Sequence, residues 1–204
     1  MEQQAGPYVM KMNRFFATVM VVGLAQTAFA QVIDGRAAKK ALFDGDKIGV
    51  QVMKQSFLVD SQTDILASVA KQQPYYGAIA VSPDEGLMSE ATIAAANYHN
   101  VEAASVAALA GCDAARKGQQ ACVIVAIVRP RGWEARPIQL SSDATAAFAK
   151  DYGGKGAALA VSASTGAWAM AHGAGAGDAA IAACAAKLTG ANAGQTDCAV
   201  IIAD

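Results

Sequence analysis

The stretch Gly77-Ala-Ile-Ala-Val-Ser-Pro-Asp-Glu-Gly86 decides the fold, because a similar stretch, Gly156-Ala-Ala-Leu-Ala-Val-Ser-Ala-Ser-Thr-Gly166, follows it eighty residues later. Each stretch is followed by an acidic residue with two alanines, in Glu102-Ala-Ala104 and in Asp178-Ala-Ala180. An alanine-rich run with one cysteine comes next, and a second cysteine then opens a short apolar run. The sequence therefore predicts two copies of one small unit.

Each copy has the pattern of a β-β-α-β unit, because apolar runs bounded by turn residues lie on both sides of an alanine-rich helix. Pro83 and Gly86 are typical of the turn between the first two strands. The predicted strands and helix of copy one are Tyr76–Ser82, Leu87–Ile93, Val101–Ala115 and Cys122–Val128. Those of copy two are Ala157–Ser162, Ala167–His172, Asp178–Leu188 and Cys198–Ala203.

Further elements are predicted outside the copies. A short helix over Arg36–Phe43, a strand over Lys47–Met53 and a helix over Asp64–Gln72 precede copy one. Two prolines and a glycine make Arg129–Pro137 a linker loop, and a helix over Asp143–Tyr152 follows it.

We expect one α+β domain over residues 31–204. It would comprise an N-terminal segment 31–75, repeat one 76–128, a linker and helix 129–155, and repeat two 156–204. A unit of about fifty residues has a thin core by itself. We therefore expect the two units to share one mixed, mostly antiparallel sheet with helices on one face.

Residues 1–30 have the three parts of an export signal. Basic residues precede the apolar stretch Phe15–Leu24, and Ala28-Phe29-Ala30 is a small-x-small cleavage site. The apolar stretch is shorter than the ~20 residues that a membrane-spanning helix needs. The sequence predicts cleavage between Ala30 and Gln31 and a periplasmic or secreted protein, with no membrane span after cleavage.

The mature chain, residues 31–204, is close to neutral, with a net charge near -2. Nucleic-acid binding needs a concentrated basic surface, which this balance does not provide. The charge therefore argues against nucleic acid as a partner.

The four cysteines all follow the predicted cleavage site and are expected to form structural disulfides. Four cysteines allow three connectivities. The repeat selects Cys112–Cys122 and Cys184–Cys198, because in each copy one cysteine lies late in the helix and the other begins the last strand. Metal ligands and redox thiols are the alternatives, but no C-x-x-C or Cys/His spacing occurs.

Two glycine-rich segments resemble nucleotide-binding motifs, but we interpret both as structural. Gly173–Ala180 contains G-x-G-x-x-A between a strand and a helix, whereas Ala96–Asn100 at the same place in copy one has no glycine. Gly153-Gly-Lys-Gly156 follows a helix, while a phosphate-binding lysine loop precedes one. A turn and a helix C-cap explain these segments, and no cofactor is predicted.

His99 is the one candidate catalytic residue. It lies on a strand-to-helix connection, where functional side chains are common, and Glu90 and Glu102 are near it in sequence. The alternative is a solvated loop histidine. No metal site is predicted, because only two histidines, His99 and His172, occur and no C-x-x-C or Cys/His spacing is found.

A cluster of arginines and aromatic residues is the best candidate for recognition, because tryptophan and arginine dominate binding hot spots. The alternative is that Trp133 anchors the linker on the core. The candidate binding residues are Arg129, Arg131, Trp133, Arg136, Tyr75, Tyr76 and Trp168.

The chain resembles small secreted bacterial domains of unknown function. In these, a Y-G-A-I-A-x-S strand and hairpin precede an E-A-A helix with a late cysteine, and another cysteine opens the last strand. Tyr76-Gly-Ala-Ile-Ala-Val-Ser82, Glu102-Ala-Ala104, Cys112 and Cys122 match this pattern. In copy two, Asp178 replaces the glutamate. The resemblance covers about 76–128 and 156–204, implies fold and compartment, and carries no catalytic residues.

Pro74-Tyr-Tyr-Gly-Ala-Ile-Ala80 and Gly132-Trp-Glu-Ala-Arg-Pro137 are also similar to alphaproteobacterial chains labelled 5-aminolevulinate synthase. The residues do not support that activity. Such a synthase is a much larger cytosolic enzyme that holds pyridoxal phosphate on a lysine.

These observations predict a non-catalytic periplasmic or secreted module that binds an envelope protein or a cell-wall component. An inhibitor or immunity protein is a special case of this hypothesis. The alternative is a small envelope enzyme that uses His99 with a nearby acid.

Overall fold

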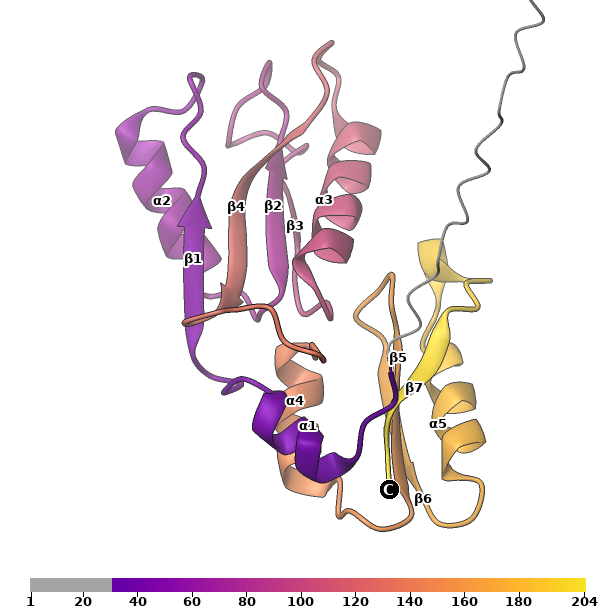
Figure 1. Ribbon diagram of the computed structural model, residues 1–204. Helices are drawn as coiled ribbons and strands as arrows, with labels where there is room; N and C mark the ends of the chain where they lie inside the picture. The colour runs from indigo at the N-terminus through magenta and orange to yellow at the C-terminus, as the bar shows by residue number, and fades with distance from the viewer. Residues whose placement is uncertain (1–30) are drawn as a thin grey trace, which may run out of the picture.

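The computed structural model describes residues 31–204, so the predicted export signal lies outside the described part (Figure 1). The helices are α1 (Gly35–Ala41), α2 (Asp60–Ala70), α3 (Val101–Ala115), α4 (Ser142–Asp151) and α5 (Ala176–Ala185), with a 3-10 turn at Gly190–Asn192. The strands are β1 (Ile48–Val52), β2 (Gly77–Val81), β3 (Ile93–Ala95), β4 (Val123–Pro130), β5 (Ala157–Ser162), β6 (Trp168–His172) and β7 (Cys198–Ala203).

The strands form two antiparallel sheets, with the orders β1-β4-β2-β3 and β6-β5-β7. The α+β class is confirmed, but the prediction of one shared sheet is wrong. The central strands β2 and β5 are each paired on both edges within their own sheet, so neither can join the other. We call β2, β3, α3 and β4 the first unit, and β5, β6, α5 and β7 the second unit.

Each central strand has one face of small side chains and one of large side chains. Ala78 and Ala80 pack with the inner face of α3, while Ile79 and Val81 belong to a core that includes Leu66 of α2. Small side chains let the helix approach the sheet closely. Figure 1 accordingly shows α2 and α3 on opposite sides of the four-stranded sheet.

The second unit repeats this division. Ala158 and Ala160 pack with α5, while Leu159 and Val161 share a core with Phe148 of α4. Both sheets are therefore covered on two faces, and the prediction of helices on one face is wrong. A register shift also occurs at the same place in both central strands, between Ile79 and Ala80 and between Leu159 and Ala160.

The hairpin of the first unit is wider than predicted. The return strand was expected over Leu87–Ile93, whereas β3 begins at Ile93. The preceding residues form turns, since the hydroxyl of Thr92 donates to the carbonyl oxygen of Leu87 at 2.7 Å and Ser89 N donates to Gly86 O. Their backbone groups are thus satisfied locally rather than by β2.

Both predicted disulfides, Cys112–Cys122 and Cys184–Cys198, are present and confirm the predicted connectivity. In each unit one cysteine is buried on the helix and its partner lies at the start of the closing strand. The bridge therefore closes the loop between the helix and that strand.

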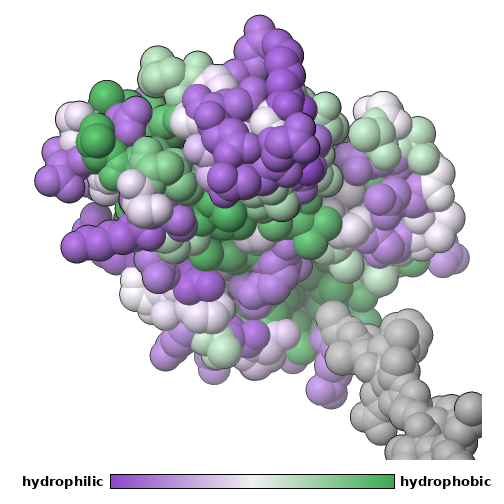
Figure 2. All heavy atoms as spheres, turned by 90° about the horizontal axis from the view of Figure 1, so that it is seen from above, coloured by the Kyte–Doolittle hydropathy of each residue, from purple (hydrophilic) through white to green (hydrophobic). Residues whose placement is uncertain are grey.

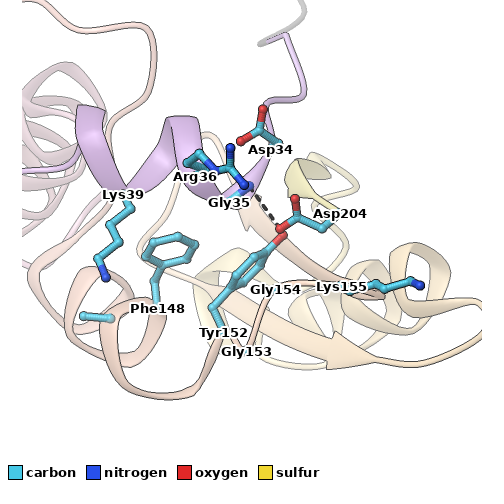
Figure 3. Close-up of a pocket in the computed structure, with 11 residues that line it drawn as sticks. Asp34, Gly35, Arg36, Lys39, Phe148, Tyr152, Gly153, Gly154, Lys155 and Asp204 are labelled. Atoms are coloured by element: carbon cyan, nitrogen blue, oxygen red, sulfur yellow. Dashed lines mark hydrogen bonds between the residues drawn. The ribbon is translucent and has the colours of Figure 1, made fainter.

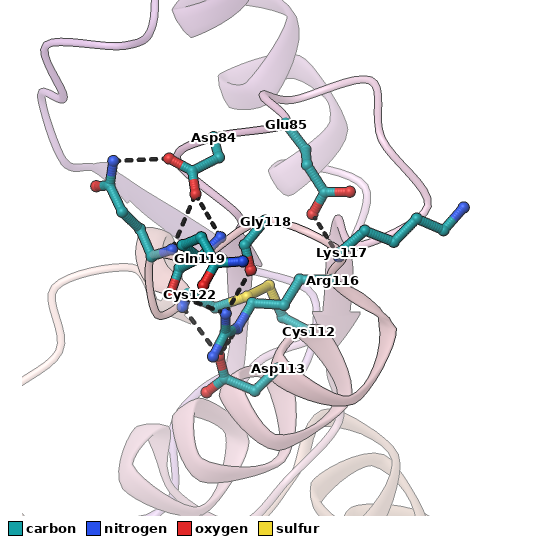
Figure 4. A network of polar contacts seen from close by, with 10 residues as sticks. Asp84, Glu85, Cys112, Asp113, Arg116, Lys117, Gly118, Gln119 and Cys122 are labelled. Carbon is teal, nitrogen blue, oxygen red and sulfur yellow. Dashed lines mark hydrogen bonds and ion pairs between the residues drawn. A yellow bond between two sulfur atoms is a disulfide. The ribbon is translucent and has the colours of Figure 1, made fainter.

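In both units a carboxylate also joins the loop between the helix and the closing strand to the turn after the central strand. The carboxylate belongs to the turn in the first unit and to the loop in the second. In the first unit Asp84, on the turn after β2, accepts hydrogen bonds from the backbone N–H groups of Gln119 and Gln120 at 2.7 and 2.8 Å (Figure 4). In the second unit the carboxylate belongs to the loop, since Asp197 accepts from the hydroxyl of Ser162 and from Ser164 N, both at 2.7 Å. Turn and loop are therefore hydrogen-bonded in both units, with the turn as acceptor in the first unit and the loop as acceptor in the second.

A second set of contacts orders the first unit's loop from the helix side. Arg116 forms an ion pair with Asp113 at 2.7 Å and donates to the carbonyl oxygens of Gly118 and Gln119 (Figure 4). Hydrogen bonds from Gln120 hold the pKa of Asp84 below its usual value.

The segment before α1 joins the second sheet. Ile33 lies parallel to β7, where its N–H donates to Ile201 O and its carbonyl oxygen accepts from Ala203 N. Within residues 31–204, no helix combines the length and hydropathy needed to cross a bilayer.

Candidate functional site

His99 lies between the two units rather than at the surface. Only 3% of the residue is exposed. Its Nδ1 accepts a hydrogen bond from Ser141 N at 3.1 Å, and its Nε2 lies 3.0 Å from the carbonyl oxygen of Ala167. Since Nδ1 accepts, Nε2 carries the proton and donates it to Ala167.

This environment favours a neutral imidazole. Burial lowers the pKa of His99 to about 4, because the charged ring would lose its hydration. Glu90 and Glu102 are exposed, and neither is hydrogen-bonded to the ring. Both nitrogens of His99 thus have structural partners, and the predicted pair of histidine and acid is not formed.

The predicted recognition cluster is divided among several places. Tyr75 and Tyr76 are core residues, each 1% exposed, so the prediction of an exposed tyrosine surface is wrong. Burial raises the pKa of Tyr76. Trp168 lies in the second unit, where Lys187 donates to its carbonyl oxygen at 2.6 Å and lies 4.5 Å from its ring centre.

Arg136 has a structural partner in α1. Its guanidinium donates to the carbonyl oxygens of Ala41 and Leu42 at 3.0 and 3.2 Å, at the C-terminal end of that helix. It also stacks on the Phe43 ring at 3.6 Å and pairs with Glu134. Arg136 therefore fixes the linker to α1, while Arg131 is exposed.

Arg129 and Trp133 remain together, beside a hollow on the four-stranded sheet. The Arg129 guanidinium lies 4.4 Å from the centre of the Trp133 ring. The hollow has a volume of about 180 Å³. We call it the Arg129–Trp133 hollow; its lining residues are Gly49, Val50, Gln51, Ile127, Arg129, Pro130 and Trp133.

Strand register explains why this part of the sheet is open. Ala78 pairs with Ile127, which pairs with Gln51, so these side chains lie on the α3 side of the sheet. α3 covers β2 and β3 there, whereas β1 is contacted by α2 from the other face. Gly49 adds no side chain to fill the space.

Two buried donor atoms beside this hollow have no hydrogen-bond partner within residues 31–204. They are Nε of Arg129 and Nε1 of Trp133, which lies beside the Tyr76 hydroxyl without a well-formed hydrogen bond to it. A buried donor without an acceptor costs about 1–3 kcal/mol. A ligand that supplies acceptor oxygens would remove this cost once the side chains around the two atoms open to it.

A larger pocket lies elsewhere, between α1, α4 and the glycine loop that follows α4 (Figure 3). Its volume is about 800 Å³. Phe148 and Tyr152 form its apolar part. Lining residues are Asp34, Gly35, Arg36, Lys39, Phe148, Ala149, Tyr152, Gly153, Gly154, Lys155 and Asp204.

The acids of this α1–α4 pocket each accept a hydrogen bond from a backbone N–H group, whereas its cations form no ion pair within residues 31–204. Asp34 accepts from Ala37 N at 2.8 Å, and Asp204 accepts from Gly35 N at 3.1 Å. The cations Arg36, Lys39 and Lys155 have no acidic or hydrogen-bonding partner among residues 31–204. Lys39 and Lys155 lie at opposite ends of the pocket in Figure 3.

The sequence did not indicate this pocket. Gly153, Gly154 and Gly156 have φ of 67°, 83° and 73°, so the segment is a left-handed loop after a helix, as expected. Its lysine, however, lines the pocket with α1. The signal was the cation among glycines, but nothing in the sequence placed α1 opposite it.

Two other features, possible metal ligands and the exposed apolar side chains of α2, offer weaker candidates for a functional site. In the described part of the chain, His, Cys, Asp and Glu side chains form no group of three that could hold a metal ion. α2 and its N-cap expose Val59, Ile65 and Val69, and Figure 2 shows hydrophobic side chains at the left, where Figure 1 places α2.

Comparisons with known proteins add no family to this picture. No protein-family model matches the chain, and neither a curated protein nor a solved structure is significantly similar to it.

Proposed function

We propose that the protein is an exported, non-catalytic binding module that recognises another envelope protein through the Arg129–Trp133 hollow. Two disulfides in a chain of this size support an oxidising compartment, periplasmic or extracellular. An inhibitor or immunity role is a special case with one tight partner.

The main observation in support of this proposal is that the Arg129 guanidinium stacks on the Trp133 ring, and that Nε of Arg129 and Nε1 of Trp133 make no well-formed hydrogen bond within residues 31–204. Stacking holds the guanidinium in place before a partner arrives, so little side-chain entropy is lost on binding. A carboxylate or backbone carbonyl group of the partner would accept from these donors.

The test is affinity capture from envelope extract with the C-terminally tagged full chain, purified after export. We expect one abundant protein whose binding to the purified chain is then measured by calorimetry. Trp133→Ala should weaken that binding at least tenfold, since hot-spot residues contribute about 2 kcal/mol or more.

Trp168→Ala is the matched control, because Trp168 is a half-buried tryptophan with a cation over its ring in the second unit. It should leave binding unchanged. Equal losses in the two variants, or binding that survives Trp133→Ala with the fold intact by circular dichroism, would contradict the proposal.

A small organic anion bound in the α1–α4 pocket is the second candidate function. The specific observation is that Arg36, Lys39 and Lys155 line a large cavity next to the rings of Phe148 and Tyr152 and form no ion pair with Asp34 or Asp204, which also line it. Such a ligand would combine a carboxylate or phosphate with an apolar body.

Chemical-shift mapping with benzoate and phenyl phosphate tests this candidate. Shifts confined to α1 and to residues 148–155, abolished by Lys39→Ala with Lys155→Ala, would support it. Lys117→Ala with Lys71→Ala is the control, because both lysines lie outside the pocket. Shifts that persist after the pocket lysines are removed would contradict it.

A further inference from the structure

β1 is an edge strand whose outer backbone groups have no partner among residues 31–204. Arg131 N donates to Lys47 O and Met53 N donates to Val125 O, so the odd-numbered residues of this segment bond to β4. In an antiparallel ladder the alternate residues point the other way. The N–H and C=O groups of Ile48, Val50 and Val52 therefore face the free edge.

The segment around β1 is complementary to itself when it is reversed. It reads Asp46-Lys-Ile-Gly-Val-Gln-Val-Met-Lys54. With Val50 opposite Val50 of a second copy, Ile48 lies opposite Val52 and Asp46 approaches Lys54. Asp46 and Lys54 are exposed. Apolar residues meet apolar residues, and each terminal acid meets a base.

We propose that the chain forms a two-fold symmetric dimer in which the β1 strands of two copies pair antiparallel, centred on Val50. All three outward residues of each strand then lie in hydrogen-bonded pairs with the second copy. A shift by two residues in either direction would place Asp46 opposite Val52 or Ile48 opposite Lys54, so the register centred on Val50 is favoured.

The opposite face of β1 gives the pairing a further consequence. Gly49 of one copy lies opposite Gln51 of the other, on the side of the sheet that carries the Arg129–Trp133 hollow. The second copy would thus supply a side chain to the space above Gly49. The dimer itself does not depend on what this hollow binds.

Sedimentation velocity of the full chain, purified after export, tests the proposal. We expect a dimer whose dissociation constant rises about tenfold in Asp46→Lys and in Lys54→Asp, because each variant turns two exposed attractive pairs into repulsive ones. The double variant Asp46→Lys with Lys54→Asp should restore the wild-type value, since opposite charges again face each other.

Val50→Pro is the second probe, because it removes an outward N–H without removing a bond to β4. It should give a monomer, and hydrogen exchange at Ile48 and Val52 should become fast. A wild-type chain that stays monomeric at about 100 μM would overturn the proposal. So would a dimer that tolerates all these variants, or edge amides protected only by a different envelope protein.

Discussion

The Nε2 of His99 donates to the carbonyl oxygen of Ala167 at 3.0 Å, so a side chain of the first unit is hydrogen-bonded to the backbone of the second. The same ring accepts from Ser141 N at the N-terminus of α4. One buried, neutral imidazole thus connects three parts of the chain.

His99 should make stability depend on pH. Its pKa is about 4 in the folded protein and about 6.5 when unfolded, so the unfolded chain binds more protons between these values. The contribution is complete above pH 6.5 and is lost as pH falls toward 4. The loss in unfolding free energy by pH 4.5, relative to pH 7.5, amounts to roughly 2–3 kcal/mol.

Urea unfolding at pH 7.5 and pH 4.5 measures this effect. His99→Gln is the control, because it cannot titrate, and it should lack this part of the pH dependence. The same pH dependence in both proteins would contradict a neutral buried ring.

Gly166→Ala should destabilise the contact between the units. A Cβ there would fall inside van der Waals distance of the carbonyl oxygen of Asn97, and backbone on both sides leaves little room to move. We expect a loss of about 2–3 kcal/mol in unfolding free energy.

Gly86→Ala is the comparison variant for Gly166→Ala, because it introduces backbone strain without a steric contact. Gly86 aligns with Gly166 in sequence, yet it has φ of 75° and nothing within 4 Å of an added Cβ. This variant should cost only about 1 kcal/mol, from the left-handed conformation. A smaller loss in Gly166→Ala than in Gly86→Ala would refute the close contact.

Each disulfide should contribute about 3 kcal/mol, because the closed loops have sequence separations of 10 and 14 residues. Thermal or urea unfolding of Cys112→Ser with Cys122→Ser, and of Cys184→Ser with Cys198→Ser, measures the two contributions separately. Loss of both should approach the behaviour of the reduced wild-type protein. Unchanged stability in either pair would show that its loop is already ordered without the bridge.

Asp84 and Asp197 should each stabilise hydrogen bonds only in their own unit, so removal of either carboxylate should change hydrogen exchange locally. Asp84→Ala should raise hydrogen exchange at the amides of Gln119 and Gln120 by about an order of magnitude, because a charged acceptor is lost. Asp197→Ala should do the same for Ser164. Each variant is the control for the other, and increases in both units from one substitution would argue for global destabilisation instead.

Much of each unit could be predicted because its signals are local. Helix α3 has the predicted bounds, Val101–Ala115, and it begins where the side chain of Asn100 accepts from Ala103 N. β5 and β7 also have the predicted bounds. The cysteine pairing followed from the repeat, since in both copies one cysteine lies on the helix and the other begins the last strand, although Cys184 lies one turn earlier on its helix than Cys112.

The candidate sites could not be predicted, because they depend on long-range packing. Nothing near His99 in sequence indicates that Ser141 and Ala167 will enclose it. Tyr75 and Tyr76 have the composition of a recognition surface, yet tertiary packing buries them. The α1–α4 pocket brings Lys39 and Lys155 together from segments that are distant in sequence.

The pairing of Ile33 with β7 has a consequence for the order of folding. The elements β1 to β4 are complete once residue 130 has been synthesised, whereas Ile33 can pair with β7 only after Ile202 has been synthesised. Contacts across such separations form slowly, because a long loop must close first. During synthesis or export we therefore expect the four-stranded sheet to fold first, while the segment before α1 stays unpaired until the last strand is available.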